Sequence, residues 1–233
     1  MIEIIYEDNH LIVVNKPAGI LSQGDKSGQI SLLEKTKQDL KKKYNKPGNV
    51  FLGLVHRLDK VVSGVMIFAK TSKAASRLSQ EFREKKTTKI YLALVPGDDK
   101  IKKSNDWIEL NQHLLRKNNF SKIIDSPQKG SQEVALKYKE LISNQKYSLL
   151  MIQLLTGRKH QIRTQLSSVG LPIIGDKKYG SGEVLGPSQI LLHAYALSLT
   201  HPTKKNRINF YSEPPEIFSK KIGFSMKDLE EIL

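Results

Sequence analysis

Runs of apolar residues along the chain predict more strands than helices. β-rich runs at residues 2–6 and 10–15 flank a turn signal and predict a hairpin. A β-branched run at 61–69 and an apolar run at 89–95 predict two further strands. The same kind of pattern predicts later strands at about 107–110, 113–115, 133–142, 147–155, 190–200 and 207–211.

Helical patterns interrupt these strands at irregular intervals. Ser31-Leu32-Leu33-Glu34 has the form of a capping box and predicts a helix that ends near Lys43. Thr71-Ser72 precedes a second amphipathic stretch, and 159–169 and 226–232 are also predicted to be helical. Strands that follow one another in sequence, with helices between some of them, favour an α+β fold with a mixed or mainly antiparallel sheet.

No repeat or long linker divides the 233 residues, a length that allows one large domain or two small ones. We therefore predict a single domain over residues 1–233. Residues 97–131 are rich in Gly, Asp, Asn, Lys and Ser, and we expect them to form an exposed, positively charged, loop-rich insertion.

The charge changes the picture of possible partners. Lys and Arg number 38 against 23 Asp and Glu, a net charge of +15 with a pI near 9.7. Such an excess is typical of proteins that bind a polyanion, above all nucleic acid. The charge is spread evenly, at +8 over 1–116 and +7 over 117–233. Because 31 of the 38 basic residues are Lys, a general lysine bias of the source proteome is the alternative explanation.

Several function classes are excluded by what the sequence lacks. Without cysteine there is no disulfide, thiolate metal site, iron–sulfur cluster or thiol nucleophile. No apolar run reaches the ~20 residues of a membrane span, and no secretory signal is visible, so we expect a cytoplasmic protein without a membrane anchor. Nucleotide-phosphate, metalloprotease and hydrolase-elbow motifs are also missing, so the sequence predicts either chemistry without a cofactor or metal, or no chemistry.

Two polar segments could carry such chemistry. His56-Arg57-Leu58-Asp59 places an imidazole, a guanidinium and a carboxylate among apolar neighbours, where a carboxylate needs a partner. Taken alone, the segment is explained slightly better by an Asp that caps a turn. The second segment, 156–166, includes Arg158, Lys159, His160 and Arg163 at the start of a predicted helix, which suits anion binding. A solvated basic face is the alternative there.

Two strand residues have simpler explanations when each is taken alone. Tyr91 lies on the strand face opposite Ile90 and Leu92, where a tyrosine usually packs in the core. His193 follows Leu191-Leu192 in an apolar strand, and a core histidine with a satisfied ring is the common outcome.

Taken in order along the chain, these segments resemble the RluA-type pseudouridine synthases, from residue 2 to about 215. The segments that carry the resemblance are Asn15-Lys16-Pro17, His56-Arg57-Leu58-Asp59 with Ser63-Gly64, Tyr91 in a K-x-Y-x-A context, Thr156-Gly157-Arg158 with His160-Gln161-Ile162-Arg163, Gly175-Asp176 with Tyr179-Gly180, and Leu191-Leu192-His193-Ala194. The resemblance implies an α+β fold with a bent sheet, flanking helices and a central catalytic cleft. It also implies isomerisation of uridine to pseudouridine in ribosomal or transfer RNA, without cofactor or metal.

The resemblance implies roles for individual residues. Asp59 would be the catalytic residue, either as a nucleophile towards ribose or uracil or as a base. Tyr91 would stack on the uracil, and Arg163 would pair with Asp59. Arg57 would fill the space of the flipped nucleotide, because an enzyme acting on a stacked base must extrude it. Further contacts with substrate or RNA are expected from His56, Arg158, Lys159, His160 and Leu192.

The sequence departs from the family pattern at Val61 and Val62, where relatives usually have a polar residue and then Thr. The Asp59 loop therefore lacks a hydroxyl that could support it. We expect no N-terminal RNA-binding domain before Ile2, and we therefore expect RNA contacts from the catalytic domain itself, including 97–131. A non-catalytic RNA-binding protein that kept the fold is the alternative function, and a monomer is expected.

Overall fold

A computed structural model describes residues 2–97, 106–118, 120–186 and 188–224. The predicted terminal helix at 226–232 lies outside these residues. Contacts between Cα atoms group the chain into two compact units, the first with residues 1–89 and 194–212 and the second with 90–193 and 213–233. We describe each unit separately, and the prediction of a single domain stays a prediction.

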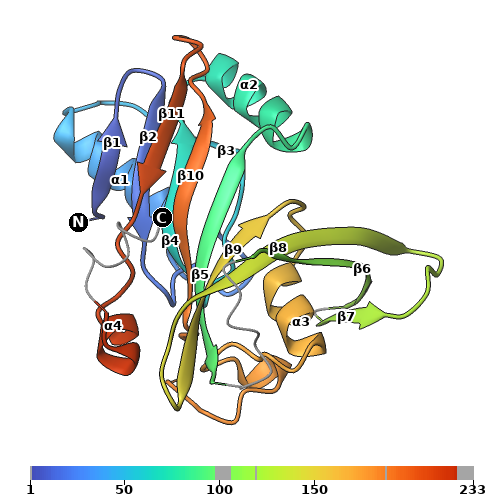
Figure 1. Ribbon diagram of the computed structural model, residues 1–233. Helices are drawn as coiled ribbons and strands as arrows, with labels where there is room; N and C mark the ends of the chain where they lie inside the picture. The colour runs from blue at the N-terminus through green and yellow to red at the C-terminus, as the bar shows by residue number, and fades with distance from the viewer. Residues whose placement is uncertain (1, 98–105, 119, 187, 225–233) are drawn as a thin grey trace. The chain divides into compact units, whose positions relative to one another are not determined.

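Two paired strands of the first unit, β2 (Leu11–Lys16) and β4 (Ser63–Ala69), are almost entirely buried. Figure 1 labels both in the sheet of this unit. Its strands are β1 (Ile4–Glu7), β2 (Leu11–Lys16), β3 (Gly53–Leu54), β4 (Ser63–Ala69), β10 (Leu192–Thr200) and β11 (Arg207–Tyr211). β2 pairs antiparallel with β1 and β4, β3 with β4, and β11 with β10, while β10 is also a neighbour of β4. Every residue of β4 is buried, as its uninterrupted apolar run predicts.

Two helices belong to the first unit, and both begin where the sequence predicts. α1 (Leu32–Lys43) opens with a complete capping box between Ser31 and Glu34. α2 (Ser72–Arg83) is capped by the Thr71 side chain and packs against β3 and β4.

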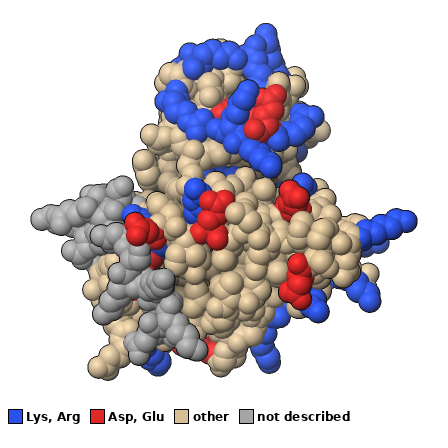
Figure 2. Space-filling view, turned by 45° about the vertical axis from the view of Figure 1, so that its right-hand side comes forward, with Lys and Arg blue, Asp and Glu red and all other residues tan. Residues whose placement is uncertain are grey.

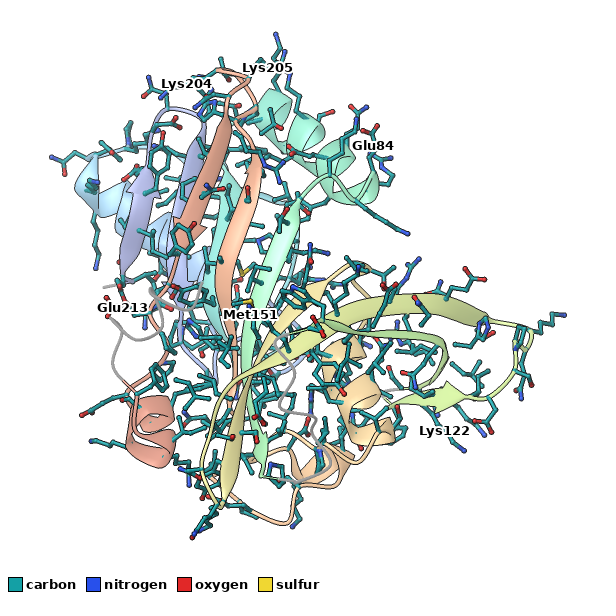
Figure 3. All side chains as sticks on the ribbon, viewed as in Figure 1. Glu84, Lys122, Met151, Lys204, Lys205 and Glu213 are labelled. Atoms are coloured by element: carbon teal, nitrogen blue, oxygen red, sulfur yellow. The ribbon has the colours of Figure 1, made fainter. Side chains whose placement is uncertain are left out.

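The second unit contains a five-stranded antiparallel sheet in the order β5-β9-β8-β6-β7. The strands are β5 (Thr88–Pro96), β6 (Ile108–Lys117), β7 (Phe120–Ile124), β8 (Ser131–Ser143) and β9 (Tyr147–Leu154). Helix α3 (Gln161–Ser168) packs against β6, β7 and the 3-10 helix η1 (Lys177–Tyr179), and α4 (Ile217–Ile222) packs against β9. Met151 of β9 is an example of the buried apolar residues in this sheet (Figure 3).

The strand pairings confirm the predicted α+β fold with a mainly antiparallel sheet. The structure differs from the prediction within 97–131. The two short strands expected at 107–110 and 113–115 are one strand, β6, because Asn111 and Gln112 continue the ladder opposite Ala135 and Val134 of β8. Asn111 and Gln112 interrupt the apolar pattern of the sequence. They do not interrupt the pairing of β6 with β8. Strand β7, η1 and α4 have no counterpart in the sequence prediction.

Candidate active site

Asp59 lies in a tight turn of the first unit that main-chain hydrogen bonds hold in place. The Val62 amide donates to the Asp59 carbonyl oxygen at 3.1 Å, and the Gly19 amide donates to the Lys60 carbonyl oxygen at 2.8 Å. On the N-terminal side, the Ser22 hydroxyl donates to the Leu58 carbonyl oxygen at 2.6 Å and accepts from the Leu58 amide at 3.1 Å. The turn is therefore tied on both sides of Asp59 to the segment that follows β2.

Lys16 is a buried cation beneath this turn. Its side chain is fully buried, and its Nζ donates to the carbonyl oxygens of Val62 at 2.7 Å, Pro17 at 3.1 Å and Lys60 at 3.2 Å. Burial lowers the Lys16 pKa to about 8, and the negative charge of Asp59 opposes that shift. One ammonium group thus organises the carbonyls on the C-terminal side of Asp59, as a group with three donors can.

Residues 62–64 show why the Ser-Gly segment follows the turn. Gly64 has φ of +120°, and a Cβ on it would lie 2.3 Å from the carbonyl oxygen of Ala194. No other residue fits this approach of β4 to β10. Val62 is buried, and its main chain takes part in the turn through its amide and its carbonyl. The departure at Val62 therefore places an apolar side chain in the core while the main-chain contacts of the turn are present.

His56 is held by the fold of the first unit. Its Nε2 accepts a hydrogen bond from the Ile67 amide at 3.1 Å, and its ring stacks on Phe82 with centroids 4.8 Å apart. Burial, with a smaller contribution from the positive charge of Lys89, lowers the His56 pKa to about 3. The ring is therefore neutral at pH 7, with its proton on Nδ1. Arg57, the next residue, is exposed.

In the second unit, Arg163 forms a buried two-point ion pair with Asp176. Its Nε donates to Oδ2 at 2.6 Å and its Nη2 donates to Oδ1 at 2.8 Å. The side chains are only 7% and 1% exposed, so this pair is shielded from solvent. Arg163 is not part of a solvated basic face, which was the alternative explanation for this segment.

Tyr179 joins the ion pair to the neighbouring residues of the 156–166 segment. The Arg163 guanidinium carbon lies 4.9 Å from the centre of the Tyr179 ring. Its hydroxyl lies 2.7 Å from Nδ1 of His160 and accepts from the Ser121 amide at 3.1 Å. His160, Arg163, Asp176 and Tyr179 therefore form one cluster, which we call the Arg163 cluster.

The rest of the 156–166 segment divides into buried and exposed residues. Gln161 is buried, and its side-chain oxygen accepts from the Thr156 hydroxyl at 2.9 Å and from the Arg158 amide at 3.0 Å. The side chains of Arg158 and Lys159 are exposed, as residues that contact RNA would have to be. Gln161 thus shapes the turn that presents them.

Tyr91 and Leu192 are both buried, at 8% and 3% exposure. Both belong to the second unit, because the boundary between the units falls within β10, after His193. Tyr91 lies on β5 opposite Ile152 of β9. Asp59 belongs to the first unit, whereas Tyr91 and Arg163 belong to the second. Their joint action therefore stays a prediction.

Two residues with evident positioning contacts were not among the candidates chosen from the sequence. Lys16 and Asp176 both occur in segments that carry the family resemblance, but no role was assigned to them. For Lys16, the signal is its position two residues after Val14 in the same strand. Residues two apart in a strand share a face, and Val14 is buried. For Asp176, no local signal exists, because its partner lies 13 residues away.

Basic side chains occur in several places on the molecular face shown in Figure 2. In the described part of the chain, no three His, Cys, Asp or Glu side chains are grouped as metal ligands. No helix among the described residues is long and apolar enough to cross a membrane.

The model of the RNA pseudouridylate synthase family matches residues 10–168. An uncharacterized RNA pseudouridine synthase of Aquifex aeolicus is 36% identical over 232 residues, which cover 93% of this chain and 71% of the relative. Ribosomal large subunit pseudouridine synthase D of Borreliella burgdorferi is 36% identical over 224 residues, 93% of this chain and 66% of the relative. This chain therefore spans about two thirds of the length of these relatives.

Solved structures agree with this assignment at the level of the fold. Human RNA pseudouridylate synthase domain containing 4 has a TM-score of 0.75 and 23% identity, and the match covers 99% of this chain and 92% of that one. The family model and the sequence relatives show that this chain belongs to the RNA pseudouridylate synthases, enzymes that isomerise uridine in RNA to pseudouridine.

Proposed function

We propose that this chain converts uridine to pseudouridine in large-subunit ribosomal RNA and that Asp59 is its catalytic residue. The observation that carries the proposal is a carboxylate in a turn whose main chain is tied down on both sides, within the segment matched by the family model. The choice of ribosomal RNA rests on the names of relatives, such as the ribosomal large subunit pseudouridine synthase D of Borreliella burgdorferi.

The reaction needs few groups from the protein. Uridine and pseudouridine contain the same atoms, so no oxidant, reductant or second substrate enters the balance. The N1–C1′ bond breaks, a C5–C1′ bond forms, the proton on C5 leaves and N1 gains one. A carboxylate can capture the electrophilic carbon formed during bond cleavage, or accept a proton. Both roles remain open for Asp59.

We propose that Arg163 and Tyr91 assist this carboxylate. A guanidinium already held by Asp176 has a fixed orientation and lacks the freedom of a surface arginine. A tyrosine packed in a strand presents a rigid ring for stacking on a flipped base. The exposed Arg57, Arg158 and Lys159 are proposed to contact RNA phosphates, which fix the register of binding without reading sequence.

The test uses a strain that lacks this chain, complemented with variants. We expect the wild-type chain to restore specific pseudouridines in large-subunit RNA, and Asp59→Asn to restore none while binding the RNA with unchanged affinity. Asp39→Asn, the same charge change on α1, is the matched control and should restore all of them. Full restoration by Asp59→Asn would rule out the catalytic assignment.

The same experiment separates the enzyme from a non-catalytic RNA-binding protein. The latter would leave the pseudouridine map unchanged on deletion while the purified chain still bound RNA. Among the residues that the structure describes, no contact favours that alternative.

We also propose that the chain is a monomer and that it acts in the cytoplasm. Light scattering on the purified 26.4 kDa chain, and fractionation of cells, check these two points.

A further inference from the structure

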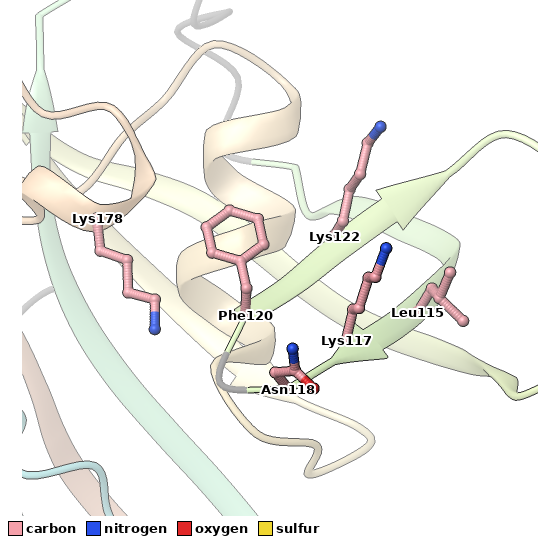
Figure 4. A pocket seen from close by; sticks show the side chains of 6 residues that line it. All are labelled: Leu115, Lys117, Asn118, Phe120, Lys122 and Lys178. Carbon is pink, nitrogen blue, oxygen red and sulfur yellow. The ribbon is translucent and has the colours of Figure 1, made fainter.

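The β6–β7 hairpin carries an open hollow that the Arg163 cluster does not include. Six residues line it: Leu115, Lys117, Asn118, Phe120, Lys122 and Lys178 (Figure 4). Its volume is about 410 Å³, within the range of small-ligand sites. None of these six lining residues is acidic, and three are lysines.

Strand register explains how these side chains come together. Lys117 pairs with Phe120 and Leu115 pairs with Lys122 across the hairpin, so these four side chains share one face. The alternate residues Leu114 and Ser121 are buried on the other face. The hairpin therefore has one face packed into the unit and one that presents an aromatic ring among lysines.

The Phe120 ring has a surface on which another ring could stack. It is 44% exposed, yet it is held by stacking on Tyr179, with ring centroids 5.0 Å apart and planes 29° apart. The Lys178 amine lies 5.8 Å from the Phe120 ring centre and 6.0 Å from that of Tyr179. The fixed ring offers a stacking surface at little entropic cost, and cations lie around it.

We propose that this hollow binds an unpaired nucleotide of the RNA substrate, with its base stacked on Phe120 and its flanking phosphates on Lys117, Lys122 and Lys178. Exposed aromatic rings combined with basic side chains are the usual means of binding single-stranded RNA. The proposal rests on RNA being the substrate, as proposed above, and adds a docking point apart from the isomerised uridine.

The contact between Phe120 and Tyr179 connects this docking point to the Arg163 cluster. Tyr179 contacts both His160 and Arg163. A base that fixes the Phe120 ring would also fix the ring beneath it. The hollow thus belongs to substrate positioning, and we expect its loss to raise KM far more than it lowers kcat.

The first experiment measures binding of a fluorescein-labelled 20-nucleotide oligouridylate by anisotropy. Phe120→Leu keeps an apolar side chain but removes the stacking surface, and should weaken binding roughly 5- to 100-fold. Phe120→Tyr should bind as the wild type does. Equal affinity of the Leu and wild-type chains would overturn the proposal, as would equal losses in the Leu and Tyr variants.

The second experiment tests the lysines through salt dependence. Changing Lys117, Lys122 and Lys178 together to Gln should reduce the slope of log affinity against log salt by about 2, since each phosphate contact on a single strand contributes about 0.7. The matched control changes the exposed Lys35, Lys41 and Lys42 of α1 to Gln, which lowers the net charge equally. Equal slopes in the two triple variants would overturn the assignment of phosphate contacts to these lysines.

A third measurement does not depend on affinity or activity. In a Trp107→Phe background, Phe120→Trp places the only indole of the chain in the hollow. Stacking on a base should quench its fluorescence when the oligouridylate is added. Absence of quenching at saturating RNA would contradict stacking. All three measurements can be made in the Asp59→Asn variant, so a failure of the catalytic proposal would not obscure them.

Discussion

The Asp59 turn and the Arg163 cluster hold their polar groups in different ways. Around Asp59, the acceptors are main-chain carbonyls, and their donors are the Lys16 ammonium, the Ser22 hydroxyl and two main-chain amides. In the Arg163 cluster, side chains contact side chains, through the pair with Asp176 and the ring of Tyr179.

This difference bears on which residues can vary. A carbonyl is present whatever the side chain, so residues 60–62 can change while the turn persists, as Val61 and Val62 illustrate. A guanidinium paired with a carboxylate needs both partners. We therefore expect substitutions to be costly at the donor beneath the turn and at both partners of the cluster.

The largest loss of stability is expected from Asp176→Ala. This change leaves the buried Arg163 guanidinium without this carboxylate, and removal of one partner of a buried pair costs about 3–5 kcal/mol. Calorimetric melting of the purified chain should show a Tm lower by roughly 6–20 °C. An unchanged Tm would mean that the pair contributes little.

A double variant separates stability from activity at the same pair. Arg163→Met with Asp176→Leu replaces both charges by apolar groups and should recover much of the lost Tm. Pseudouridine formation should remain absent, because Arg163 is proposed to assist Asp59. Restored activity in this variant would remove that role.

The next effect is expected at Gly64, in the strand that follows the turn. Gly64→Ala places a Cβ against the Ala194 main chain at a positive φ, for a combined cost of about 2–4 kcal/mol. Urea denaturation measures it. Gly28→Ala is the control, since its φ is also positive but no atom lies within 4 Å of the added Cβ.

Lys16→Met tests the donor beneath the turn. Three carbonyls lose this partner, which should cost about 1–3 kcal/mol and reduce kcat by roughly 10- to 100-fold through displacement of Asp59. KM should change little. Lys42→Met on the exposed side of α1 is the control, and equal kcat in both variants would contradict the positioning role.

The smallest expected effect is a pH dependence at His56. Its folded pKa, about 3, lies below the unfolded value near 6.5, so the unfolded chain binds the extra proton first as pH falls. Stability should therefore decrease from about pH 6.5 towards pH 3, by about 1 kcal/mol at pH 5.5 from this residue alone. His56→Gln should flatten that part of the curve measured by denaturation, and an unchanged slope would contradict the assignment.

Local patterns could be predicted from the sequence, whereas contacts between distant residues could not. The capping box joins Ser31 and Glu34, which are only three positions apart, so its pattern is visible in the sequence, and it is confirmed. The family resemblance and the enzyme class are confirmed by the family model. The strand that includes Asn111 and Gln112 was divided in the prediction, because pairing with β8 outweighs local polarity.

The site shows the same limit. The sequence indicates that segment 156–166 is functional, but it does not indicate that Arg163 pairs with Asp176. Composition does not determine which carboxylate forms an ion pair with which arginine. Lys16 is separated from Val62 by 46 residues of sequence. Roles assigned to Tyr91, Arg57 and Leu192 remain predictions for mutagenesis.

Lys16 also offers a chemical probe of the turn that contains Asp59. Amine reagents modify lysines that meet solvent in the unprotonated form, and the Lys16 side chain is fully buried although its pKa is lowered to about 8. Acylation at this position therefore requires the turn to open, and once open the amine reacts as an ordinary lysine. The rate of labelling at residue 16, compared with that of exposed lysines in the same sample, would measure how often the Asp59 turn opens in solution.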